Sequence, residues 1–103
     1  MYGEEWEREV LSKLDEAEKE IYYDLKEYAE KNHYKLNPNK SVVVAIIKGL
    51  RRNEIRYGAR YCPCRQVSGN PIEDMKIICP CVYHRDEIEQ DGHCKCRIFV
   101  RGD

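Results

Sequence analysis

The pattern of apolar and polar positions predicts two amphipathic helices in the first half of the chain. From residue 4 to about residue 32, apolar side chains recur at steps of three and four, the spacing of one helix face. We therefore expect an N-terminal helix over about residues 4–32 whose apolar stripe faces the core. One continuous helix of this length would measure roughly 40 Å, which is long for a small domain, so a break within it stays open. The stripe consists of Trp6, Val10, Leu14, Ala17, Ile21, Leu25 and Tyr28.

A second helix is predicted over about residues 38–53. Asn37 and Pro38 are residue types favoured at the N-cap and at the first helical position. Gly49 lies inside this helix, where glycine costs about 1 kcal/mol relative to alanine. A glycine there would allow another backbone to approach closely. The apolar face of this helix consists of Val42, Val43, Ile46, Ile47 and Leu50.

The second half of the chain has no long helical or alternating pattern. A turn over residues 68–71 precedes a short helical candidate that ends near Ile77. Another short helix is predicted over Arg85–Gln90, before Gly92. Residues 97–100 are expected to be extended. The predicted fold class is therefore mainly α: a small single domain over residues 1–103, with short helices, loops and little or no β-sheet.

Charge and composition narrow the function classes. Eighteen basic and nineteen acidic residues give a net charge of −1, so no bulk field attracts the chain to nucleic acid or to a membrane surface. No apolar run resembles a signal peptide or a membrane span. We therefore expect a cytoplasmic protein with no nucleic-acid or membrane partner. In a reducing compartment, clustered cysteines indicate metal or redox chemistry more often than structural disulfides.

All six cysteines lie between residues 61 and 100. Four thiolates complete the coordination of a zinc ion or an iron–sulfur cluster, and two further thiols can form a reversible disulfide. Zinc knuckles and bacterial ferredoxins use Cys-x-x-Cys spacing, which is absent here. Proline lies inside two of the pairs, and spacing alone does not say which pair does what. The cysteines form three Cys-x-Cys pairs, Cys62/Cys64, Cys79/Cys81 and Cys94/Cys96.

Five short stretches of the sequence together form one motif. They are Ile47–Leu50, Tyr57–Tyr61, Cys62–Arg65, Cys79–Val82 and Cys94–Cys96. In this order they resemble the catalytic subunit of ferredoxin:thioredoxin reductase. The resemblance covers about residues 20–100, and its motif is specific, because three Cys-x-Cys pairs with proline in the first two rarely arise otherwise.

The resemblance implies an oxidoreductase with a [4Fe-4S] cluster beside a redox-active disulfide. Cys64 and Cys96 would form the disulfide, with Cys64 as the exposed sulfur that attacks the partner and Cys96 against the cluster. The implied partners are ferredoxin as electron donor and thioredoxin, or a thioredoxin- or glutaredoxin-like protein, as acceptor. Plant-type enzymes add a small variable subunit. The implied cluster ligands are Cys62, Cys79, Cys81 and Cys94.

The chain departs from the usual family pattern in two ways. The gap between the first two pairs is shorter than usual, and the gap between the last two is longer. The family's last pair usually encloses a histidine that assists the thiol chemistry, whereas this chain has Lys95. Either His84 or His93 could replace that histidine, although each is also expected as an ordinary surface residue. Basic residues beside the sulfurs, Arg65, Lys95 and Arg97, should favour thiolates unless they are plain surface charges.

Two other classes of function remain as alternatives to the reductase. In a binding module, four cysteines would hold zinc or a cluster for stability alone, and the other two would be idle. In a simple electron carrier, the cluster would work without disulfide chemistry. Metal and sulfide analysis separates zinc from iron–sulfur, and thiol counting then separates the reductase from the carrier.

Overall fold

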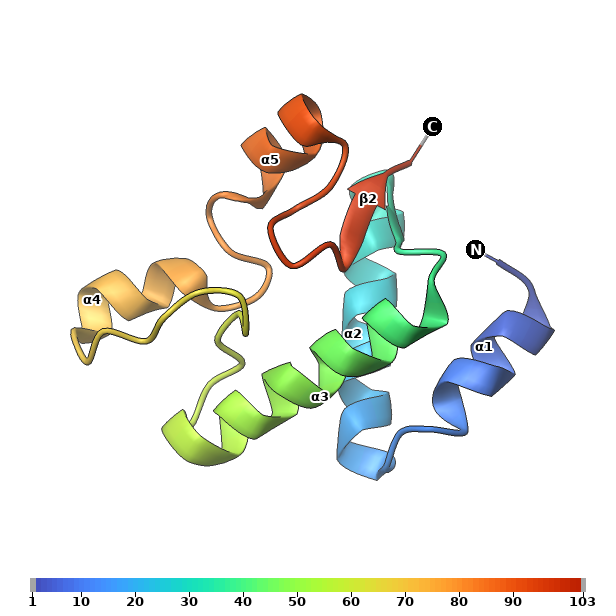
Figure 1. The fold of residues 1–103 in the computed structure, drawn as a ribbon, viewed down its shortest axis with the longest axis horizontal. Helices are drawn as coiled ribbons and strands as arrows, with labels where there is room; N and C mark the ends of the chain where they lie inside the picture. Colours follow the sequence, from blue (N-terminus) through green and yellow to red (C-terminus); the bar gives the residue numbers. More distant parts are fainter. Residues whose placement is uncertain (1, 103) are drawn as a thin grey trace.

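Helices dominate the computed structural model, which describes residues 2–102 (Figure 1). The prediction of a mainly α fold is confirmed, and within the described residues the sheet is limited to two short strands. In that part of the chain no helix has both the length and the apolar character needed to cross a bilayer. The elements are α1 (Glu4–Leu11), α2 (Glu16–Lys31), β1 (Tyr34–Leu36), α3 (Lys40–Tyr57), α4 (Pro71–Asp74), a 3-10 helix (Met75–Ile77), α5 (His84–Asp91) and β2 (Phe99–Arg101).

The single helix predicted over about residues 4–32 is divided into α1 and α2. Asp15 is the N-cap of α2, and its carboxylate accepts a hydrogen bond from the Glu18 amide at 2.8 Å. The Glu18 carboxylate accepts in return from the Asp15 amide at 2.9 Å. This capping box satisfies amides that a continuous helix would have bonded internally, so the chain can turn before Asp15. The apolar stripe still faces the core, since Val10 of α1, Leu14 in the turn and Ile21 of α2 are all buried.

α3 begins and ends later than the sequence predicts. Its N-cap is Asn39, whose side chain accepts from the Ser41 amide at 3.0 Å, and not Asn37. Asn37 is used elsewhere, because its amide donates to the carbonyl of Ile98 at 2.9 Å. The helix ends at Gly58, which has a left-handed φ of 85° that favours glycine.

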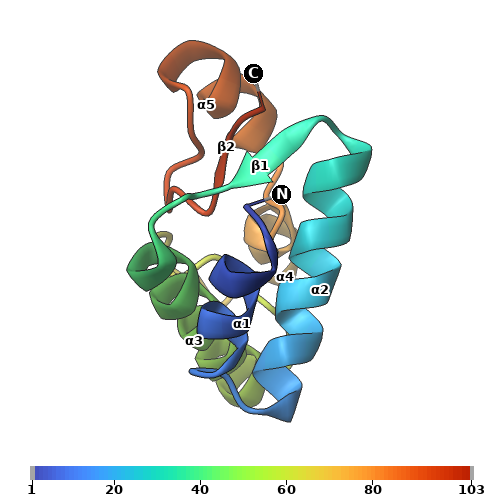
Figure 2. The same ribbon diagram turned by 90° about the vertical axis from the view of Figure 1, so that its right-hand side faces the viewer.

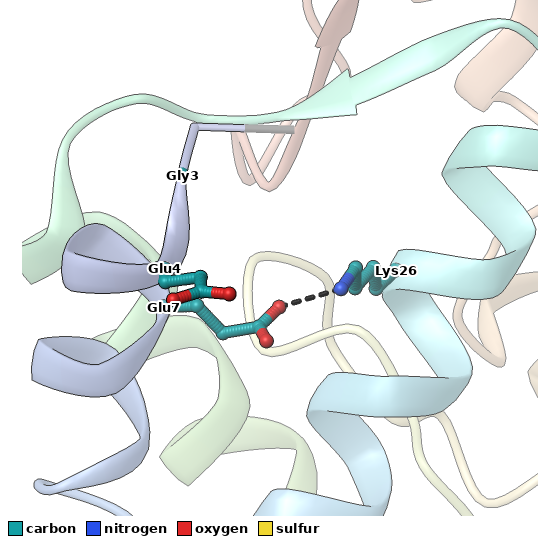
Figure 3. A pocket seen from close by; sticks show the side chains of 4 residues that line it. All are labelled: Gly3, Glu4, Glu7 and Lys26. Carbon is teal, nitrogen blue, oxygen red and sulfur yellow. Dashed lines mark hydrogen bonds and ion pairs between the residues drawn. The ribbon is translucent and has the colours of Figure 1, made fainter.

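The helical core lies between α1, α2 and α3, and Figure 2 shows α1 in the foreground between the other two. An ion pair fastens α1 to α2: Glu7 Oε2 accepts from Lys26 Nζ at 2.6 Å and from the Tyr22 hydroxyl at 2.8 Å. Figure 3 shows the two charged side chains pointing toward each other across a surface pocket. The hydrogen bond from Lys26 is the main reason that the pKa of Glu7 lies below its usual value.

The strands β1 and β2 join distant parts of the chain. They pair antiparallel, with Leu36 opposite Phe99. Phe99 is 1% exposed, and its ring lies 5.4 Å from that of Tyr28 on α2. The segment predicted to be extended thus overlaps β2, which pairs with β1 and packs on the helical core. The short helices predicted near residues 71–77 and 85–90 are present as α4 with the 3-10 helix, and as α5.

Candidate functional site

Backbone hydrogen bonds hold the first and second cysteine pairs side by side. The Cys62 amide donates to the carbonyl of Ile77 at 2.8 Å, and the Cys79 amide donates to the carbonyl of Arg60 at 2.9 Å. The two segments form a short antiparallel bridge between these bonds. Loops without regular secondary structure are thereby fixed against each other, with one cysteine of each pair in the ladder.

The first pair is also packed against α3. A Cβ added to Gly49 would lie 2.8 Å from the Cβ of Pro63. Gly49 is therefore the point of close approach that the sequence suggests, but the neighbour is a proline ring rather than a backbone. This contact sets Pro63, between Cys62 and Cys64, directly on the helical core.

The third pair lies in a tight turn that leads into β2. The Cys94 amide donates to the carbonyl of Phe99 at 3.1 Å, and the Arg97 amide donates to the carbonyl of Cys94 at 2.9 Å. Arg97 has a φ of 66°. The Phe99 amide also lies 3.4 Å from Cys94 Sγ and donates to it. Because β2 is seated on the core, Cys94 and Cys96 are held in place as well.

The sulfur of Cys96 links the first pair to the third. It lies 3.8 Å from Cys94 Sγ, and its thiol is close enough to those of Cys62 and Cys64 to contribute to the pKa of each. Cys64 and Cys96 are thus direct neighbours, although thirty-one residues of sequence (residues 65–95) separate them. All six cysteines are free thiols in the structure.

The six thiols differ in their exposure to solvent. Cys64 is exposed, whereas Cys96 is 7% exposed and Cys62 is 2% exposed. Cys81 and Cys94 are buried and Cys79 is half-buried. A large partner can therefore reach Cys64 directly, while Cys96 is reached through Cys64.

Hydrogen bonding to the Cys96 thiol is the main cause of the pKa shifts of Cys62 and Cys94. It lowers the pKa of Cys62 to about 7 and that of Cys94 to about 6. The same bonds raise the pKa of Cys96. Burial raises the pKa of Cys79 well above its usual value, and the neighbouring sulfurs of Cys62, Cys94 and Cys81 raise it further. These pKa shifts favour the thiolate forms of Cys62 and Cys94 and the protonated form of Cys96.

Comparison with known families agrees with this constellation. Residues 10–103 match the family described as ferredoxin thioredoxin reductase catalytic beta chain. The chain belongs to this family. Three relatives are named as catalytic chains of ferredoxin-thioredoxin reductase: those of Porphyra purpurea (33% identical over 74% of this chain), Arabidopsis thaliana (30% over 91%) and Synechocystis sp. (30% over 75%).

The chain aligns with only part of the length of each relative. The aligned regions span 63% of the Porphyra purpurea protein, 65% of the Arabidopsis thaliana protein and 64% of the Synechocystis protein. The comparisons also overturn the predicted cytoplasmic location. The relatives from Arabidopsis thaliana, Oryza sativa and Spinacia oleracea are named chloroplastic, not cytoplasmic.

The donor set of this family member suits an iron–sulfur cluster by its chemistry. All three loops contribute thiols to one largely buried group, and thiolates are the ligands such clusters use. Among residues 2–102, no group of three or more His, Cys, Asp or Glu side chains is placed to hold a single metal ion. A cluster sets a different requirement, because each of four cysteines binds its own iron atom. The division of the six thiols into four ligands and one pair stays a prediction.

Two of the basic residues favour thiolates as predicted, Lys95 at Cys64 and Arg65 at Cys62 and Cys81, but each is only a minor contribution to the pKa. Lys95 favours the thiolate of Cys64, but partial burial and the neighbouring sulfurs outweigh it and raise the pKa of Cys64. Arg97 is exposed, and its backbone amide is the group that contributes at Cys94. Arg65 is largely shielded and paired with Glu87 at 2.7 Å, so it is not a plain surface charge.

The two histidines near the cysteines also differ from each other. His84 is buried, with Nδ1 bonded to the carbonyl of Cys81 and Nε2 lying 2.6 Å from the Tyr28 hydroxyl. Both ring nitrogens are therefore engaged, and the surface position expected for His84 is wrong. His93 is half-buried, and its Nδ1 lies 2.8 Å from the carbonyl of Cys94. Lys95 is exposed between Cys94 and Cys96.

Sequence reasoning missed Glu87 and Tyr28. Glu87 on α5 contacts both the residue after Cys64 and the backbone between Cys94 and Cys96. Along the sequence it looks like any other acidic residue of a short polar helix. Tyr28 was expected as a core residue, and nothing in the sequence pairs its hydroxyl with His84.

Proposed function

We propose that this chain reduces the disulfide of a thioredoxin or thioredoxin-like protein with electrons from a ferredoxin. In this proposal Cys64 and Cys96 are the reacting thiols. The chain would hold a [4Fe-4S] cluster, which supplies electrons one at a time, and the ligands would be Cys62, Cys79, Cys81 and Cys94. Family membership supports the reaction class.

One observation carries the proposal: an exposed thiol, Cys64, lies beside a buried thiol, Cys96, from a distant loop. A simple electron carrier has no need of an exposed thiol beside a buried one. A structural metal site has no need of it either. A dithiol that exchanges with a partner disulfide needs both, because one sulfur must be reached by the partner and the other must then resolve the adduct.

The residues of the chain allow a balanced sequence of steps. The Cys64 thiolate attacks one sulfur of the partner disulfide, forming a mixed disulfide and releasing one partner thiolate, which takes up a proton. Cys96 loses its proton and attacks the Cys64 sulfur, so the mixed disulfide breaks and the second partner thiol leaves. The partner gains two electrons and two protons, and the Cys64–Cys96 disulfide remains to be reduced again.

Two single substitutions test these roles. With Cys96→Ser, no resolving thiol remains, so a mixed disulfide between Cys64 and thioredoxin should accumulate on a non-reducing gel. With Cys64→Ser, no adduct should form, because Cys96 is buried. Both variants should retain the iron and sulfide content of the wild-type protein.

The double variant Cys64→Ser/Cys96→Ser is the matched control, since any adduct in it would come from another cysteine. An adduct with Cys64→Ser and none with Cys96→Ser would reverse the two roles. Loss of iron from either variant would move that residue to the ligand set. Zinc instead of iron in anaerobically purified wild-type protein would contradict the proposed cofactor.

The partners belong to the same proposal. Ferredoxin is the donor, a thioredoxin- or glutaredoxin-like protein is the acceptor, and a small variable subunit is a further candidate partner. Turnover of thioredoxin by the purified single chain, with reduced ferredoxin as the only electron source, would show that no second subunit is required.

A further inference from the structure

A single carboxylate connects the loops that carry the proposed redox pair. Glu87 Oε2 accepts a hydrogen bond from Arg65 Nη2 at 2.7 Å. Glu87 Oε1 accepts from the backbone amide of Lys95 at 3.2 Å. Arg65 directly follows Cys64, and Lys95 directly precedes Cys96. Each oxygen of Glu87 therefore binds a residue next to one of the two sulfurs.

The Arg65 side of the bridge is shielded from solvent, whereas the Lys95 side is exposed. The side chains of Arg65 and Glu87 are 16% and 25% exposed. The guanidinium of Arg65 lies over the ring of Tyr83, 4.6 Å from its centre. The Arg65 Nε atom is buried without a hydrogen-bond partner in the described residues. Low exposure limits screening by salt, so the ion pair with Glu87 is stronger than an exposed one would be.

Helix α5 provides the support that such a bridge needs. Glu87 lies within α5, and the next residue, Ile88, is buried in the core. Gly92 closes the helix with a left-handed φ of 84°. The carboxylate is thus presented by a seated helix, whereas the two loops that it joins have no regular structure of their own. Without the Glu87 carboxylate, the two loops would be joined through their thiols alone.

We propose that Glu87 is a positioning residue for the Cys64–Cys96 pair. Its bridge keeps the first and third cysteine loops at the separation at which the disulfide can form. This inference rests on the proposed function of the two thiols. A disulfide requires the two Cα atoms to lie about 4.4–6.8 Å apart. When the loops are held near that distance in the dithiol, less ordering is needed to form the bond, and the disulfide is favoured.

The potential of the pair is the measurement that separates positioning from general stability. The holoprotein is equilibrated anaerobically with mixtures of reduced and oxidised dithiothreitol, and the Cys64–Cys96 disulfide is quantified by alkylation and peptide mass. In Glu87→Gln the volume is kept and the charge toward Arg65 is lost. We expect the equilibrium constant for disulfide formation to fall about tenfold, which corresponds to about 30 mV for a two-electron couple.

Glu89→Gln is the matched control, because it removes the same charge from an exposed position of α5. It should leave the potential unchanged. Glu87→Asp keeps the charge but shortens the reach, so it should shift the potential in the same direction as Glu87→Gln. Arg65 is a poorer probe, since its side chain also hydrogen-bonds with Cys81, a proposed cluster ligand.

The outcomes separate this inference from the proposed function. If wild-type protein forms the disulfide and Glu87→Gln shows the same potential as Glu89→Gln, the positioning role is overturned and the function stands. A lower melting temperature without a change in potential would also overturn it, since that is the result of a merely structural contact. If wild-type protein forms no Cys64–Cys96 disulfide, both proposals fail. Should Glu87→Gln not fold with its iron, Glu87→Asp gives the same comparison.

Discussion

The two halves of the molecule are stabilised by different means. Up to Gly58, the buried side chains are almost all aliphatic or aromatic, and most of them lie on amphipathic helices. From Ala59 onward, four of the buried residues are cysteines, and several large apolar side chains are exposed instead. The buried cysteines are Cys62, Cys81, Cys94 and Cys96, and the exposed apolar residues include Ile72 (73%), Met75 (67%) and Val82 (62%).

This contrast shows where the fold depends on chemistry beyond apolar burial. The helical half buries mainly apolar side chains, so the hydrophobic effect is its main source of stability. The cysteine-rich half is held by short backbone ladders and by its contacts with α3 and β1. A metal group bound by its thiols would stabilise it further. A bound group that organises such loops adds its binding free energy to their folding.

The largest effect should follow from removing a proposed ligand. We expect Cys79→Ser to lose most of its iron and to lose hydrogen-exchange protection over residues 59–98, because the loops lose their organising centre. Amides of α2 and α3 should stay protected. Cys64→Ser, which changes a thiol outside the ligand set, is the control and should keep both iron and protection. Full iron content in Cys79→Ser would remove Cys79 from that set.

The link between the halves should be the next most sensitive point. Phe99 is buried against Tyr28 and paired with Leu36, so Phe99→Ala should reduce the free energy of unfolding by about 3–5 kcal/mol. Val100, only partly buried on the same strand, is the matched control, and Val100→Ala should cost much less. Urea unfolding of the holoprotein measures both. Equal losses would show that β2 is not seated through Phe99.

Gly49→Ala sets helix propensity against packing. Alanine favours the helix by about 1 kcal/mol, but its Cβ would meet the Pro63 ring at 2.8 Å, and overpacking of this kind costs about 1–3 kcal/mol. We expect a net loss of stability and faster hydrogen exchange at the Cys62 amide. Ala45→Gly, at an exposed position of α3, should destabilise the helix without this selective exchange. A stabilised Gly49→Ala protein would contradict the close contact.

The smallest effect concerns the ion pair between α1 and α2. The pKa of Glu7 is lowered by its hydrogen bond from Lys26, so the pair stabilises the fold above the unfolded glutamate pKa of about 4.3. This stability is lost as the pH falls through the lower pKa of the folded state. Wild-type protein should therefore exceed Glu7→Gln by up to about 1 kcal/mol at pH 7, and the difference should vanish in acid.

Thermal unfolding of both proteins between pH 7 and acid conditions measures the change. Glu5→Gln is the control, because it removes a charge from the same helix turn at an exposed position. A pH-independent difference between wild type and Glu7→Gln would show that packing, and not the ion pair, accounts for the loss.

Local patterns predicted the helices but not all of their ends. Asp15 and Glu18 have the spacing of a capping box, yet the apolar stripe continues through Leu14 and Ala17 and suggested one helix. The stripe continues because the turn itself is seated on the core. Asn37 looked like the helix cap, but its amide and side chain bond the carbonyls of Ile98 and Arg97, which are far away in the sequence.

For the candidate site, the sequence by itself determined the set of reactive groups: six thiols in three tight pairs, within a motif that resembles one family. Only the tertiary structure decided that Cys96 lies between Cys94, Cys62 and Cys64, and that Cys64 is the exposed thiol of the six. It also decided that Glu87 joins two of the loops. The physical reason is range: spacing and residue type act over a few residues, whereas contacts between loops tens of residues apart depend on how α3, α5 and β2 pack together.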